Sequence, residues 1–74
     1  MNSKEWNTHV VGLVSRERED GVRVAVPPAA YRMSESAEGH YVFLGASGIK
    51  WTLTLPELAR YVNSRDLKID GEWP

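Results

Sequence analysis

The sequence predicts an α+β domain: a small antiparallel sheet of two hairpins, with one main helix in the C-terminal half packed on it. Three observations support this class. Valine recurs at every second position over 22–26, which is the period of a strand with one buried face. A longer apolar run, HYVFLGASGIKWTLTL (40–55), is interrupted by glycines at its middle, as a hairpin is at its turn. An amphipathic segment with a capping signal, 54–62, then follows.

The first hairpin is expected in the N-terminal third of the chain. Residues 8–14, THVVGLV, are apolar and β-branched on both faces, as in a strand that is covered on two sides. The charged segment 15–21, SREREDG, reads as a loop that ends in a glycine. The valine strand 22–26 returns beside the first strand, and Pro27 and Pro28 end it because neither can donate a ladder hydrogen bond.

The second hairpin follows a short connection. We expect one helical turn over 29–33 and a loop over 34–39, SESAEG. The hairpin itself turns at 45–48. Period-two alternation on its second strand places three apolar residues on the inner face, namely Ile49, Trp51 and Leu53.

The helix carries the most specific local signal. Thr54 and Glu57 stand in the capping-box relation, with Leu53 and Leu58 at the two staple positions. Pro56 lies in the first turn, where its missing N–H costs nothing. Asn63 is the expected end, and one face carries Leu55, Leu58, Ala59 and Val62. A short edge strand is expected at 67–69.

Length and charge limit the classes of protein that fit. The chain of 74 residues predicts one domain, 1–74, with ends at 1–7 and 70–74 that we expect to fray. The lack of cysteine excludes a disulfide framework and a thiol nucleophile. No signal or membrane segment is evident, so we expect a cytoplasmic protein that does not bind membranes. A net charge of −1 suits phosphate contacts poorly.

No catalytic pattern is present. The two imidazoles, His9 and His40, lie at no metal-ligand spacing from each other or from a carboxylate. Carboxylates occur in charge-mixed runs that are typical of solvated surface. We therefore expect no enzyme activity, no cofactor and no metal site.

A protein-binding module fits the remaining residues. Tryptophan and arginine are enriched among the energetic anchors of interfaces. Trp6 and Trp73 lie near the two ends, where each could be an interface anchor or fill the core of a small sheet. The residues predicted to bind a protein partner are Trp6, Arg16, Arg18, Arg23, Tyr31, Arg32 and Trp73. We expect a monomer, because the helix can cover the sheet of its own chain.

One segment resembles a known family of DNA-binding proteins. Over about 11–55, the order of hairpin, proline turn and hairpin resembles the AbrB/MazE swapped-hairpin regulators and antitoxins, on Gly21, Val24, Val26, Pro27, Arg32, Glu38, Gly39, Tyr41 and Val42. The resemblance implies a DNA-binding dimer whose contacts include Arg16, Arg18, Arg23 and Arg32. The chain departs from the family in a longer Gly–Pro interval, the second proline Pro28, and His40 in place of a common aspartate.

The chain as a whole resembles the small phage-encoded regulators that bind bacterial RNA polymerase. The shared features are its shortness, the absence of cysteine, near-neutral charge and terminal aromatics, as in KEWNTH (4–9) and DGEWP (70–74). This resemblance implies a non-enzymatic protein that inhibits or modulates transcription in the host cytoplasm. An anti-CRISPR-type inhibitor would share the same features.

Overall fold

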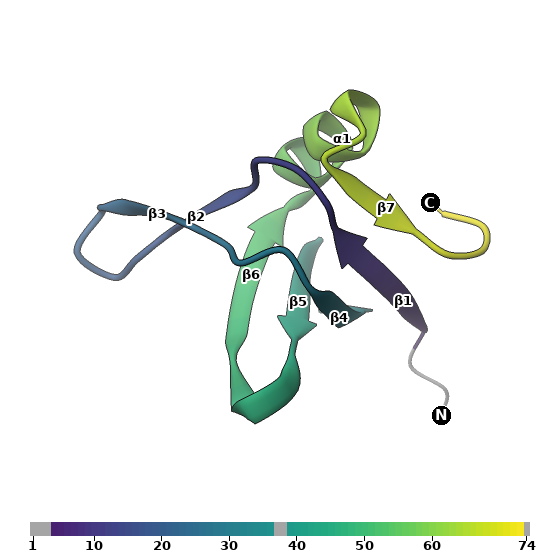
Figure 1. The fold of residues 1–74 in the computed structure, drawn as a ribbon, viewed down its shortest axis with the longest axis horizontal. Coiled ribbons are helices and arrows are strands. Elements are labelled where there is room, and N and C mark those ends of the chain that lie inside the picture. Colours follow the sequence, from purple (N-terminus) through teal and green to yellow (C-terminus); the bar gives the residue numbers. More distant parts are fainter. Residues whose placement is uncertain (1–3, 37–38, 74) are drawn as a thin grey trace.

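The computed structural model describes residues 4–36 and 39–73. Its elements are β1 (Glu5–Val10), β2 (Ser15–Glu17), β3 (Arg23–Ala25), β4 (Ala30–Glu35), β5 (His40–Leu44), the 3₁₀ turn η1 (Ala46–Gly48), β6 (Lys50–Thr54), α1 (Leu55–Ser64) and β7 (Leu67–Ile69). Five strands form an antiparallel sheet in the order β6-β5-β4-β1-β7, and β2 and β3 form a separate hairpin (Figure 1). The predicted α+β class, with one helix on an antiparallel sheet, is confirmed.

Several sequence predictions fall on residues that the structure leaves out. Residues 1–3 and 74 belong to the ends expected to fray, and 37–38, which include Glu38 of the swapped-hairpin resemblance, belong to the expected 34–39 loop. All of these lie outside the described residues. Within the described part, residues 5–7 form the first half of β1.

The first strand ends earlier than the apolar run predicts. β1 stops at Val10, and the chain then turns through Gly12 instead of continuing as a strand to residue 14. The carbonyl of Asp66 accepts hydrogen bonds from the N–H groups of Val11 and Gly12, at 2.9 and 3.0 Å. Its carboxylate accepts a third from Leu13, at 3.1 Å. This distant residue holds the turn, which local periodicity cannot indicate.

The first hairpin is present, but its strands differ from those predicted. Its first strand is β2, which lies inside the segment expected to be a charged loop, and it pairs Arg16 with Val24. The connecting loop is correspondingly shorter and is closed by a hydrogen bond from the Arg18 N–H to the Val22 carbonyl, 2.8 Å. Residues 8–10, expected to pair with this valine strand, pair instead with β4 and β7.

The helical turn predicted over 29–33 is wrong. This segment is the first part of β4, the central strand of the sheet, which pairs with β1 on one side and β5 on the other. Tyr31 and Met33 alternate with exposed Ala30 and Arg32, and both are buried. Burial of these two side chains on one face fixes the extended conformation.

The second hairpin, β5–β6, is confirmed, with its turn in η1. Trp51 and Leu53 face the core as predicted, with 4% and 1% of their surface exposed. Ile49 does not: it follows the turn and is 44% exposed. The terminal edge strand is also confirmed as β7, whose Leu67 is buried.

The helix begins as its sequence predicts. Thr54 is the N-cap, and both hydrogen bonds of the capping box with Glu57 are present. The helix runs to Ser64, one residue beyond the expected end at Asn63, and closes through Arg65 in a left-handed conformation with φ of 68°. On its predicted apolar face Leu58 is buried, whereas Leu55 at the first position is exposed.

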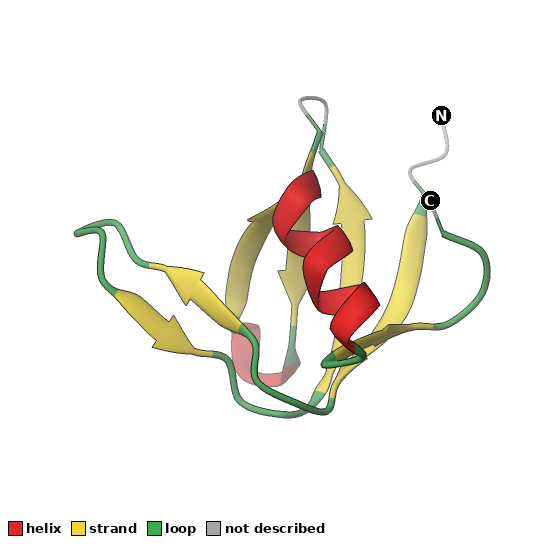
Figure 2. Ribbon diagram, turned by 90° about the horizontal axis from the view of Figure 1, so that it is seen from above, coloured by secondary structure: helices red, strands yellow, loops and turns green. Residues whose placement is uncertain are grey.

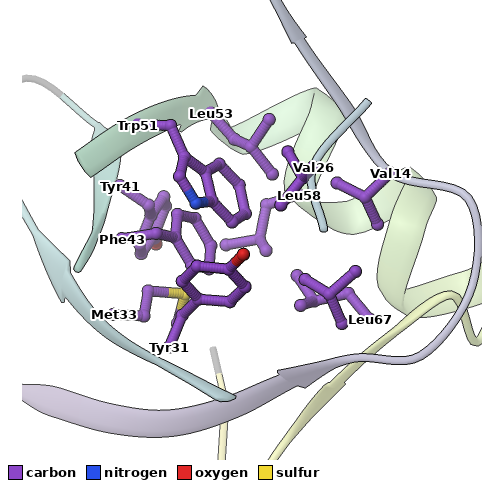
Figure 3. Packing of buried hydrophobic residues seen from close by; sticks show 11 residues of the cluster. Val14, Val26, Tyr31, Met33, Tyr41, Phe43, Trp51, Leu53, Leu58 and Leu67 are labelled. Carbon is purple, nitrogen blue, oxygen red and sulfur yellow. The ribbon is translucent and has the colours of Figure 1, made fainter. Parts of the chain in front are cut away.

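The core lies between one face of the sheet and α1, which crosses that face (Figure 2). Phe43 and Trp51 stack with ring centroids 4.1 Å apart, and Tyr31 meets Trp51 edge-on at 5.2 Å (Figure 3). The remaining buried residues include Val10, Val14, Val26, Met33, Tyr41, Leu53, Leu58 and Leu67. No helix in the described residues is long and apolar enough to cross a membrane.

Candidate functional site

The β2–β3 hairpin projects from the body of the molecule as an arm with two different faces (Figure 1). Side chains of paired residues lie on the same face of a hairpin, and successive pairs alternate between faces. The pair Glu17–Arg23 therefore faces one way, and the pair Arg16–Val24 faces the other. The first face is turned toward α1 and the second is turned toward a groove.

The face toward α1 is fixed by polar contacts. The guanidinium of Arg23 donates to the hydroxyl and carbonyl oxygens of Ser15, at 3.1 and 3.0 Å, and to the Glu57 carboxylate at 3.3 Å. The hydroxyl of Tyr61 lies 3.3 Å from the Ser15 nitrogen, which donates to it, and 3.2 Å from the Ser15 hydroxyl oxygen. These contacts join the arm to the first and second turns of the helix.

The ionisation of these groups reflects the same contacts. Burial would raise the pKa of Glu57, but hydrogen bonds from Thr54 and Arg23 outweigh it and hold that pKa below the ordinary value. Burial would likewise raise the pKa of Tyr61, but contacts with Ser15 and Arg23 lower it overall. The Tyr61 hydroxyl raises the pKa of Arg23 most, desolvation opposes this, and Glu57 adds to the rise, so that the pKa lies above its ordinary value. Arg23 and Glu57, which join the arm to α1, are therefore both charged at neutral pH.

The opposite face of the arm borders an open groove of about 790 Å³. Its lining consists of Arg16, Arg18, Glu19, Asp20, Val24, Ala25, Val26, Pro27, Ile49 and Trp51. The lining combines apolar residues of β3, of the segment that follows it and of β6 with charged residues of β2 and the hairpin loop. A surface that combines apolar and charged side chains is typical of protein-binding sites.

Of the charged groups that line the groove, one pair is already joined. Arg18 contacts the Asp20 carboxylate at 2.9 Å, and both side chains are about half exposed. Such an exposed pair contributes little to stability and can exchange partners at small cost. Arg16, by contrast, makes no salt bridge to another described residue.

A second aromatic group lies at the other end of the molecule. Trp6 packs on Tyr41 with centroids 6.4 Å apart, and Trp73 meets Tyr41 edge-on at 5.9 Å. The indole N–H of Trp6 donates to the Glu72 carbonyl at 2.9 Å. That of Trp73 is buried and has no hydrogen-bond partner in the described part of the chain. Both tryptophans are half-buried against the core.

The seven residues predicted to bind a partner therefore do not form one surface. Arg16 and Arg18 lie on the groove, while the C-terminal segment with Trp73 lies on the opposite side of the molecule (Figure 1). Arg23 is engaged with the helix. Arg32 lies on the exposed face of the sheet, 3.8 Å from the Glu5 carboxylate. These residues belong to four separate regions.

Tyr31 is not a surface residue. It is 4% exposed, and its hydroxyl donates to the Pro27 carbonyl at 2.7 Å. Burial raises the pKa of that hydroxyl. Sequence reasoning missed the groove residues Val24, Ile49 and Trp51, because it assigned all three to the inner faces of strands. The signal for Ile49 was its place directly after the glycine-rich turn, where a strand is least covered.

Metal coordination finds no geometric support in the described residues. Over 4–36 and 39–73, no three His, Asp or Glu side chains gather in a way that could hold a metal ion. His9 and His40 are both exposed on the sheet.

Comparisons with protein-family models, with curated proteins and with solved structures found no match.

Proposed function

We propose that this chain is a non-enzymatic regulator that binds another protein through the groove beside the β2–β3 arm. The observation that carries the proposal is the two-sided arm. One face is fixed to α1 by Arg23 and Tyr61, and the other borders a groove lined by two arginines, Arg16 and Arg18, and by apolar residues. A preorganised arm reduces the conformational entropy that is lost on binding.

Charge distribution favours a protein over DNA as the partner. Of the four arginines that the swapped-hairpin resemblance assigns to DNA, three contact carboxylates of their own chain: Arg18, Arg23 and Arg32. Glu19 and Asp20 also line the same groove. Phosphates would be repelled by these carboxylates, whereas a protein surface can match both signs.

The proposed partner is bacterial RNA polymerase, and the proposed effect is inhibition or modulation of transcription. This choice rests on the whole-chain resemblance to small phage-encoded regulators and on the type of surface, a groove lined by both apolar and charged residues. A monomer is the proposed state, since β1 pairs with β4 and β7 of its own chain and leaves no central gap for a second copy to fill. An anti-CRISPR-type inhibitor would use the same groove on a different partner.

Purified RNA polymerase, as core enzyme and with σ factor, tests this proposal by calorimetry and by transcription from a σ-dependent promoter. We expect binding and a change in transcript yield. Arg16→Ala should weaken binding without loss of thermal stability, while Arg60→Ala, an exposed arginine on α1 outside the groove, serves as the matched control.

Two outcomes would contradict the proposal. Absence of binding to either form of the polymerase would remove this partner. Salt-sensitive retardation of duplex DNA in a gel, together with a dimer in sedimentation, would instead support the AbrB/MazE-like alternative.

A further inference from the structure

Strand β6 forms one edge of the sheet and has a neighbouring strand, β5, on one side only. In an antiparallel pair, residues that exchange hydrogen bonds alternate with residues whose N–H and C=O point outward. The Gly45 N–H donates to the Ile49 carbonyl at 2.8 Å, so the hydrogen-bonded residues that follow on β6 are Trp51 and Leu53. The backbone groups of Lys50 and Thr52 therefore point away from β5.

A second contact agrees with this alternation of inward-pointing and outward-pointing backbone groups along β6. The backbone N–H of Thr54, next in the outward series, donates to the Glu57 carboxylate at 2.9 Å instead of to β5. No backbone hydrogen bond joins Lys50 or Thr52 to any element beyond β5 among the residues described. This leaves two N–H donors and two carbonyl acceptors along a short stretch of open edge.

The arm stands opposite this open edge. β2 approaches β6, but the two strands do not pair. Cavities lie on both faces of the edge: the groove of about 790 Å³ on the side of Trp51, and a smaller one of about 250 Å³ on the side of Thr52 and His40. Arg18 lines both of them.

We infer that the bound protein contributes an extended segment that pairs with the outer edge of β6, at Lys50 and Thr52, as a sixth strand. This inference rests on the proposed function and specifies its binding mode. An added strand lies about 4.8 Å from its neighbour, and its alternate side chains fall on opposite faces. Main-chain hydrogen bonds to Lys50 and Thr52 supply affinity, while the cavities on the two faces select side chains.

The lining of the larger groove defines the chemistry of that segment. Its apolar lining residues include Val26, Pro27 and Trp51. Its charged lining residues include Arg16 and Arg18, and Arg16 has no carboxylate partner among the described side chains. The favoured segment is therefore extended, with an apolar residue and a carboxylate at alternate positions on the face toward this groove, and with the carboxylate within reach of Arg16.

A direct test uses a synthetic peptide in which valine and glutamate occupy every second position with threonine between them, so that both fall on the face toward the larger groove. Amide hydrogen exchange by NMR is the readout. The amides of Lys50 and Thr52 should exchange fast in the free protein and slow on addition of the peptide, since each gains a carbonyl acceptor. Methylation of the peptide nitrogens that face β6 should weaken binding about tenfold, whereas methylation on the opposite edge should not. Lysine in place of glutamate should also weaken it.

Variants of the chain test the same edge. Thr52→Pro removes the outward N–H at a position where an edge strand tolerates proline, and Thr52→Ala, which keeps that N–H, is the control. We expect about a tenfold loss of peptide binding for the first and little change for the second. A thermal melt identifies any loss of folding, and in that case the exchange data and the methylated peptides decide.

The outcomes separate this inference from the proposed function. Binding of RNA polymerase that is insensitive to Thr52→Pro and leaves both amides in fast exchange overturns the added strand but keeps the protein-binding function. Protection of the amides by the peptide without polymerase binding supports the added strand and removes the proposed partner. Absence of any peptide binding at millimolar concentration, or a second copy pairing at β6 in sedimentation, overturns the inference.

Discussion

The body of the molecule and its arm are held by different kinds of interaction. In the body, Phe43, Met33 and Leu58 are fully buried, and the rings of Phe43 and Trp51 stack on the core face of the sheet (Figure 3). The arm contributes to this core through the two residues at its base, Val14 and Val26. Beyond these two residues it is attached to α1 by hydrogen bonds between Ser15 and Tyr61 and by one partly exposed ion pair.

This difference implies that folding and the position of the arm can be changed separately. Complete burial of a large apolar side chain stabilises a fold by about 1.5–3 kcal/mol, whereas a single hydrogen bond contributes about 0.5–1.5 kcal/mol net. Loss of a core side chain should therefore reduce global stability. Loss of an arm contact should mainly increase local opening.

Phe43→Ala should give the largest effect. It removes a fully buried ring that stacks on Trp51, and we expect a loss of about 3–5 kcal/mol in the free energy of unfolding. Urea denaturation followed by tryptophan fluorescence measures it. If the variant does not fold, Phe43→Leu provides a smaller step, and a loss below about 0.5 kcal/mol there would show that the stack is not central to stability.

Thr54→Ala should have an intermediate effect. It removes the N-cap hydroxyl of α1 and half of the capping box, so we expect a loss of about 1 kcal/mol. Binding to a partner, measured per folded molecule, should remain unchanged. Ser at this position should restore most of the stability, and failure of that rescue would mean that the threonine methyl, not the cap, matters.

Tyr61→Phe should have a smaller and more localised effect. It deletes a hydroxyl whose contacts with Ser15 measure 3.2 to 3.4 Å, so we expect a loss of about 0.5–1 kcal/mol. Amide exchange should accelerate over 15–25 and stay unchanged in β4 and β5. An equal acceleration throughout would show that the arm and body open as one unit.

The smallest effect concerns pH. The pKa of Glu57 is lowered in the folded state, so its contribution to stability is present above the ordinary value of 4.5 and is lost as pH falls through the lowered value. The stability difference between the native chain and Glu57→Gln should therefore shrink on acidification below about pH 4.5. A difference that stays constant from neutral to acid pH would argue against charge-dependent anchoring of the arm.

Local signals were sufficient for part of the fold. The capping box of Thr54 and Glu57 lies within four consecutive residues, so the sequence contains the whole motif. The β5–β6 hairpin is equally local, because its turn and both strands are adjacent. The edge strand β7 was likewise predictable from its short apolar alternation.

Other parts depend on residues far apart in the sequence. The segment 29–33 has no strong propensity of its own, and it is a strand because Tyr31 pairs with Thr8 and Met33 with Phe43. The break after Val10 depends on Asp66, which no local pattern indicates. Tertiary contacts override the local reading at both places.

The candidate site was predictable only in part, for the same reason. The arginines of the charged hairpin were identified from composition, and Arg16 and Arg18 do line the groove. Sequence alternation could not show that the groove would open between the arm and β6, because the two are about thirty residues apart and do not pair. Nor could it show that Tyr31 is buried.

The pairing of β1 with β7 also constrains the order of folding. Thr8 lies opposite Ile69, so one edge of the sheet joins segments from near the two ends of the described chain. Contacts between residues so distant in sequence form late and slow the rate of folding. During synthesis on a ribosome, the β4–β5–β6 meander can form first, but one side of β1 stays unpaired until residues 67–69 emerge. An incomplete chain therefore exposes a strand edge that chaperones would have to protect.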